Sequence, residues 1–248
     1  DVHYTLGIVF FLVVFALIFV FLIKRKPILN QKTQETVKES LKAGLTFVFK
    51  DKVILGALTL DMVAVLFGGA VAIFAVFAKD VLDAGPKGFG ILNAALSSGS
   101  IITMLATTHL PITKNTGKKL LVAVFGFGLC MIVFGVSKLF WLSVVTLFFA
   151  GVFDGVSMVI RQTILQLKTP DDMRGRVGAV NSMFVGSSNE LGALESGIAA
   201  KLFGAPLAVV LGGTATLFTV IIMGLKNKFL KNLDLTYDAE EYQEGLES

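Results

Sequence analysis

The sequence is poor in charged residues and contains almost no cysteine or histidine. Only 16% of its 248 residues are charged and 54% are hydrophobic, whereas soluble domains carry about 25% charged residues. So few charges cannot cover a water-facing surface, which argues against a soluble domain and, despite a net charge of +4, against a nucleic-acid partner. A single cysteine, Cys130, excludes an intrachain disulfide, and we expect it to be a packing residue.

The motifs of soluble enzymes and metal sites are missing as well. His3 and His109 are isolated and show no metal-ligand spacing. The segment 117–119, Gly-Lys-Lys, lacks the upstream glycine and the hydroxyl residue of a phosphate-binding loop. Neither a Ser-His-Asp set nor a Gly-x-Ser-x-Gly elbow is present. We therefore expect no enzyme activity, no cofactor and no metal.

Long apolar runs are the dominant feature of the chain. A membrane-spanning helix needs about 20 predominantly apolar residues, and seven segments qualify: 4–23, 53–77, 89–108, 119–137, 140–166, 177–202 and 205–225. These runs are too long for strands and lack their period-two alternation, which excludes a transmembrane barrel. The sequence thus predicts an all-α membrane protein. Its parts are a transmembrane helix over 1–23, a linker over 24–52, a six-helix bundle over 53–225 and a tail over 226–248.

The linker and the tail have patterns of their own. Val37, Leu41, Leu45 and Val48 recur at helical spacing, which predicts an amphipathic helix at the cytoplasmic interface. A solvated connector is the alternative. The tail from Asp234 onward is acidic and polar, and we expect it to be disordered.

Lysines and arginines are distributed unequally between the loops. If 24–52 is cytoplasmic, most of the 22 basic residues fall on that side. The other side holds only Lys79, Lys87, Lys138 and Lys201. Because cytoplasmic loops are enriched in Lys and Arg, the sequence predicts an N-terminus outside and a C-terminus in the cytoplasm.

Four carboxylates fall inside the predicted spans: Asp61, Asp154, Glu190 and Glu195. Ionisable groups at membrane depth are costly unless they are paired or hydrated, so they are functional candidates by default. Asp154 and Glu190 lie near the middle of their spans and are the main candidates for handling a proton or cation. The structural alternative for each is an ion pair or a capping role.

Helical geometry separates the two glutamates. At about 100° per residue, Glu190 points roughly 140° away from Glu195, so both cannot face one narrow cavity. Asn181 shares a face with Glu195. One glutamate is expected to line a pathway and the other to serve as a structural partner, with Arg161 as the candidate for that pairing. Arg161, in line with Asp154, either neutralises a carboxylate on a neighbouring helix or extends to the cytoplasmic surface.

Three segments resemble the major facilitator superfamily, in the branch that holds enterobactin exporters and macrolide efflux proteins. They are Asp-Met-Val-Ala-Val-Leu-Phe-Gly-Gly-Ala at 61–70, Val-Leu-Asp-Ala-Gly-Pro-Lys-Gly-Phe-Gly-Ile-Leu at 81–92, and 169–197. The last is the most specific, with Thr-Pro-Asp-Asp-Met-Arg-Gly-Arg-Val followed by Asn-Glu-Leu-Gly. One departure is the turn at 111–119, which lacks the acidic residue of the family's pattern.

The resemblance implies a twelve-helix transporter of which this chain is a part. Residues 4–23 then correspond to the last helix of the N-terminal half, which is otherwise missing, and 53–225 to the C-terminal six-helix bundle. Two halves rocking around a midplane site give alternating access. We expect proton-coupled efflux of a small amphipathic molecule, by antiport across a bacterial inner membrane. The alternatives are a nutrient importer of the same fold and a non-transporting membrane scaffold or sensor.

The resemblance also ranks the polar residues. Asp154 or Glu190 is the expected exchanging carboxylate. The other candidates for coupling or for substrate binding are Asp61, Glu195, Asn181 and Asn189. The candidates for gating and cytoplasmic charge are Arg161, Arg174 and Arg176. The implied partners are the lipid bilayer, a small-molecule substrate, a proton and the missing N-terminal half.

Overall fold

The computed structural model describes residues 2–22, 36–68, 71–109 and 112–237, in two units that divide between residues 36 and 37. The first unit contains α1 (Val2–Leu22), an apolar helix of 21 residues. At 1.5 Å per residue it is about 30 Å long, which matches the thickness of the bilayer's hydrocarbon core.

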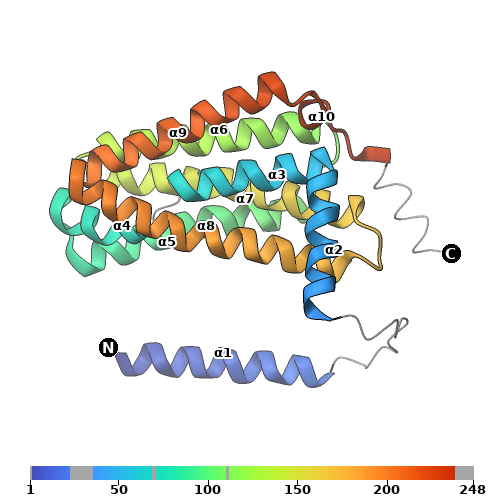
Figure 1. The fold of residues 1–248 in the computed structure, drawn as a ribbon. Helices are drawn as coiled ribbons and strands as arrows, with labels where there is room; N and C mark the ends of the chain where they lie inside the picture. Colours follow the sequence, from blue (N-terminus) through green and yellow to red (C-terminus); the bar gives the residue numbers. More distant parts are fainter. Residues whose placement is uncertain (1, 23–35, 69–70, 110–111, 238–248) are drawn as a thin grey trace. The chain divides into compact units, whose positions relative to one another are not determined.

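The second unit is a helical bundle (Figure 1). Its elements in chain order are α2 (Val37–Lys50), α3 (Lys52–Val63), η1 (Ala64–Gly68), α4 (Val71–Val76), η2 (Phe77–Val81), α5 (Gly85–His109), α6 (Thr116–Val136), α7 (Phe140–Lys168), α8 (Arg174–Phe203), α9 (Ala205–Lys226) and α10 (Lys228–Lys231). The long helices run along the bundle, and α2 crosses one end of it. No strand occurs in the part of the chain that the structure describes, which confirms the all-α prediction.

Five stretches are long and apolar enough to cross a membrane: Lys52–Val81, α5, α6, α7 and α9. Each lies within a few residues of a predicted span. The sixth predicted span of the bundle corresponds to α8, which has 30 residues but is not among these five. Glu190 and Glu195 make it less apolar than its neighbours, although its length suffices.

Two short connections have clear local causes. The side chain of Asp51 accepts hydrogen bonds from the backbone N–H groups of Val53 (2.8 Å) and Ile54 (2.9 Å). It is therefore the N-cap that starts α3 directly after α2. Gly204 connects α8 to α9 with φ +83°, a left-handed conformation that glycine adopts without strain. Pro206 then occupies the first turn of α9, where its missing N–H costs nothing.

Small residues let α5 and α7 approach closely. A Cβ atom on Gly151 would lie 1.9 Å from the Leu96 carbonyl oxygen, and one on Gly99 would lie 2.1 Å from that of Phe148. The Ser100 hydroxyl donates to the Gly151 carbonyl at 2.9 Å across the same contact. The α5–α7 pair is therefore a tight, hydrogen-bonded core element.

The amphipathic segment of the linker forms α2, whose buried residues are Gly44 and Val48. A Cβ on Gly44 would lie 2.8 Å from the Arg176 carbonyl oxygen, so α2 packs directly on the first turns of α8. Val37, at the start of the helix, is 85% exposed. The apolar stripe of α2 thus faces the bundle along part of its length.

The segment after α10 is folded, in contrast to the expectation of disorder from Asp234 onward. Leu233 and Leu235 are buried. The Leu235 N–H donates to the Thr113 carbonyl at 3.0 Å, and the Asp234 carboxylate accepts from the Asn115 N–H at 3.0 Å. The expectation was wrong up to residue 237 because Leu233 and Leu235, on either side of Asp234, are buried beside the start of α6. Residues 238–248 lie outside the described part.

Candidate functional site

A buried ion pair joins α3 to α7. The Arg161 guanidinium donates through Nη1 to Asp61 Oδ2 at 2.6 Å, and the two residues are 5% and 7% exposed. The same Nη1 donates to Asn181 Oδ1 on α8 at 3.4 Å. Arg161 therefore neutralises a carboxylate on a neighbouring helix, and the alternative of reaching the surface was wrong. Its partner is Asp61, not a glutamate of α8.

Asp154 lies on α7, two turns before Arg161, and belongs to the same charged group. It interacts electrostatically with both Arg161 and Asp61, and Ser100 of α5 lies beside its carboxylate. Among the described residues, no cation lies within ion-pair distance of Asp154. Asp61, Asp154 and Arg161 are called the charge cluster below.

A small cavity separates the two carboxylates of the charge cluster. Its volume is about 10 Å³, and it is lined by Asp61, Ala64, Val65, Val124, Phe127, Asp154 and Ser157. A space of this size accommodates roughly one water molecule when polar partners surround it. The Nε atom of Arg161 is buried and has no hydrogen-bond partner among the residues that the structure describes. The charge cluster therefore has both an unsatisfied donor and room for a bridging water.

The charges of the cluster do not balance. One guanidinium cannot neutralise two carboxylates, so the charge cluster carries an excess negative charge when both aspartates are ionised. A buried uncompensated charge is strongly unfavourable, and uptake of a single proton removes it. The chemistry that the arrangement supports is reversible protonation inside the bundle.

The glutamates and asparagines of α8 divide between two faces. Asn181 is half-buried and contacts the charge cluster through Arg161. Glu195 is half-buried and accepts from the Ser196 hydroxyl at 3.3 Å. Asn189 and Glu190 are exposed on the second unit. The structure thus brings Asn181 to the charge cluster and leaves Glu190 outside it.

Arg174 and Arg176 lie in the first turn of α8, directly after the connection from α7. Arg174 forms an ion pair with Asp171 at 2.9 Å, and Asp171 is almost fully exposed. Arg176 Nη1 contacts the sulfur of Met173 at 3.3 Å. No group of His, Cys, Asp and Glu that could hold a metal occurs among the residues described.

The sequence alone did not identify the pairing of Asp61 with Arg161. These residues lie 100 positions apart, and helical periodicity gives the face of each residue but not which faces meet. The lining residues Val124 and Phe127 carried no polar signal either. The one usable sign was that Arg161 is the only arginine inside an apolar run, which requires a buried anion nearby.

Comparison with known proteins agrees with the helical architecture. Residues 2–244 match the family described as transmembrane secretion effector. An enterobactin exporter from Shigella flexneri is 27% identical over 187 residues, which cover 75% of this chain and 43% of that protein. Its counterpart from Escherichia coli O1:K1 is 26% identical over the same length, with 75% and 44% covered. An enterobactin exporter from Citrobacter koseri is 28% identical over 136 residues, with 55% and 32% covered.

The matched residues span less than half the length of each of these relatives. No solved structure matches the chain. The relatives are exporters rather than enzymes, in agreement with the absence of catalytic motifs. The chain is an integral membrane protein that belongs to the transmembrane secretion effector family, within the major facilitator superfamily.

Proposed function

We propose that this chain is part of a secondary active transporter that exports a small amphipathic molecule in exchange for protons. The family match and the named exporters among its relatives support an efflux role. Enterobactin, the molecule in the relatives' names, is the first substrate to test. In this proposal the protein lies in a bacterial inner membrane with its C-terminus in the cytoplasm and works by alternating access, together with a second half-transporter.

The charge cluster is the observation that carries the proton coupling. Arg161 is held by Asp61 at 2.6 Å and by Asn181 at 3.4 Å, so Asp154 is the carboxylate without a close cation. A proton on Asp154 makes the charge cluster neutral. When this proton is released, both Asp61 on α3 and Asp154 on α7 are ionised, and the two carboxylates compete for Arg161. Protonation therefore changes the relative stability of two arrangements of these helices, which is the requirement for a population shift.

The test uses the full-length protein in proteoliposomes with an imposed pH gradient. We expect D154N to abolish the dependence of enterobactin efflux on the gradient, because the amide cannot ionise. E190Q is the matched control, since Glu190 is also a mid-span carboxylate but lies outside the charge cluster. An unchanged response to the gradient in D154N would refute the assignment. Loss of the response to the gradient in E190Q alone would assign proton coupling to Glu190, on the exposed face of α8.

The gating roles of Arg174 and Arg176, and the coupling roles of Glu195 and Asn189, stay predictions. Both arginines occupy the turn against which α2 packs through Gly44. In the proposed orientation this turn is cytoplasmic, where movement between the halves would be transmitted. That placement favours a mechanical role over substrate contact.

A further inference from the structure

An apolar groove runs between α6 and α7 at the end of the bundle where α6 begins. Its volume is about 660 Å³, and it is lined by Ile112, Lys118, Lys119, Val122, Ala123, Phe153 and Val156. Volumes of 300–1,000 Å³ are typical of sites that hold a small molecule. This groove is separate from the charge cluster, with which it shares no lining residue.

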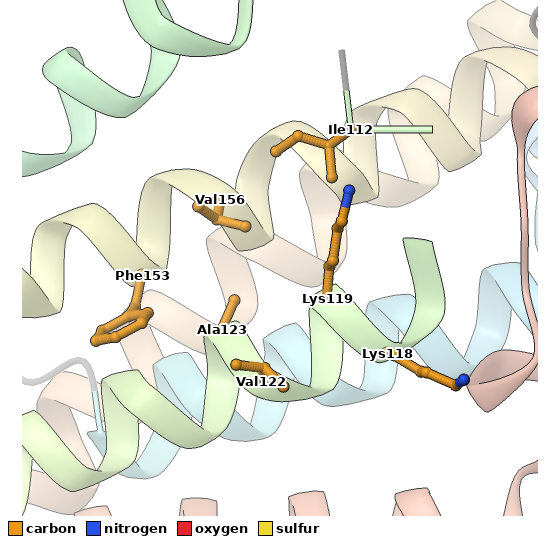
Figure 2. Close-up of a pocket in the computed structure, with 7 residues that line it drawn as sticks. All are labelled: Ile112, Lys118, Lys119, Val122, Ala123, Phe153 and Val156. Carbon is orange, nitrogen blue, oxygen red and sulfur yellow. The ribbon is translucent and has the colours of Figure 1, made fainter. Parts of the chain in front are cut away.

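The groove is apolar at one end and basic at the other. Figure 2 shows Phe153 at the first end and Lys119 beside Ile112 at the second; Lys118 lies on the same turn of α6, and its side chain extends away from Lys119. The ring of Phe153 lies against Gly126, where a Cβ would be 2.7 Å from it. From Lys119 to Gly126 is about 10 Å along α6. The groove therefore extends roughly 10 Å from its basic end toward the middle of the spans.

Both lysines are exposed, and neither forms an ion pair with any residue that the structure describes. Val122, between them and the apolar end, is 65% exposed. The described residues of the second unit thus supply neither an anion for the basic end nor a cover for the apolar walls. A ligand that satisfies both carries a negative headgroup and a hydrocarbon chain.

We propose that the groove binds one anionic phospholipid of the cytoplasmic leaflet. Its phosphate lies at Lys119, with Lys118 adding positive charge at the same end, and one acyl chain follows Val122 toward Phe153. The polarity of the groove fits a lipid in the proposed orientation, which places the start of α6 at the cytoplasmic surface. Lysines near an anionic surface gain attraction, and their aliphatic stems line apolar walls while the ammonium stays at the interface. The inference rests on that orientation and not on the transported molecule.

The test is native mass spectrometry of the purified full-length protein. It is mixed with phosphatidylglycerol or with phosphatidylcholine of identical acyl chains. We expect one phosphatidylglycerol to bind in preference to phosphatidylcholine. K118Q/K119Q should reduce that preference by about fivefold for each lysine, the ratio that corresponds to ~1 kcal/mol per basic residue. V122W, which fills the groove without altering charge, should lower binding of both lipids. K138Q/K201Q, which removes two positive charges at the opposite end of the bundle, is the charge-matched control.

Four results would overturn the proposal. Equal retention of the two lipids would show that the charge of the lipid headgroup does not determine which lipid binds. Unchanged preference in K118Q/K119Q would place the lipid elsewhere. Displacement of the lipid by glycerol 3-phosphate at similar concentration would indicate a free-anion site in which the acyl chain has no part. Absence of any bound lipid in the unmodified protein, as expected if another segment of the transporter covers the groove, would equally refute it.

Discussion

Removing members of the charge cluster one at a time should affect stability in a definite order. R161M leaves Asp61 and Asp154 buried with no cation, whereas D61N leaves Arg161 with Asp154 as its remaining anion. D154N leaves the 2.6 Å pair of Arg161 and Asp61 intact. We therefore expect R161M to be the most destabilising variant and D154N the least.

The magnitudes follow from burial. The side chains of Arg161 and Asp61 are 6% and 10% exposed, and breaking such a pair by removing one partner costs about 3–5 kcal/mol. That range applies to R161M. D61N keeps a carbonyl oxygen that can accept from Arg161 but loses the charge, so about 1–3 kcal/mol is expected. D154N should stay within about 1 kcal/mol, since it breaks no ion pair.

The assay is denaturant unfolding of the purified protein in detergent micelles, followed by loss of helical circular dichroism. R161M/D61L should recover part of the stability lost in R161M, because it removes one of the two orphaned carboxylates. A D154N variant that is as unstable as R161M would refute the reasoning, since it would mean that Asp154 is the main partner of Arg161. Equal stability of all three single variants would show that these charges are hydrated and not buried.

Two further predictions concern other parts of the bundle. G151A should destabilise the protein by about 1–3 kcal/mol, because its Cβ would lie 1.9 Å from the Leu96 carbonyl oxygen. In the same unfolding assay G186A, with nothing within 4 Å, should be neutral. The hydrogen bonds from the Asn115 N–H and from Thr236 lower the pKa of Asp234 from 3.8 to about 2. A lowered carboxyl pKa stabilises the folded form above the unfolded value. Hydrogen exchange should therefore show the Asn115 amide protected above pH 4 and losing protection as the pH falls through about 2. D234N should reduce that protection at pH 5, and equal protection in both proteins would contradict the assignment.

The sequence predicted the helices well because membrane burial is a one-dimensional signal. Runs of about 20 apolar residues are readable without knowledge of tertiary structure. The approximate helix bounds and the separation of Glu190 from Glu195 follow from composition or from 3.6-residue periodicity. Each of these depends on residues within one segment.

The charge cluster and the docked tail were not predictable in the same way. Both depend on which faces of distant helices meet: Asp61 with Arg161 in one case, and Asp234 with the Asn115 backbone in the other. The turn at 111–119 lacks an acidic residue of its own, and Asp234 brings a carboxylate to it from 119 positions away. A motif search along the chain finds neither arrangement, because the contributing residues are contiguous only in space.

The exposed face of α8 places a physical demand on the rest of the transporter. Glu190 lies near the middle of a 30-residue helix, is exposed, and makes no hydrogen bond or ion pair within the described part of the chain. Direct contact with lipid hydrocarbon at that depth would be strongly unfavourable for a carboxylate. Gly186 and Gly197 on the same helix have open space where a Cβ would be, so this side of α8 is not packed by its own bundle. A polar partner or a water-filled pathway must therefore meet Glu190. Asp154 is enclosed in the charge cluster without a close cation, so in the proposed transporter the two mid-span carboxylates are suited to different tasks: internal proton exchange for Asp154, and contact with the pathway for Glu190.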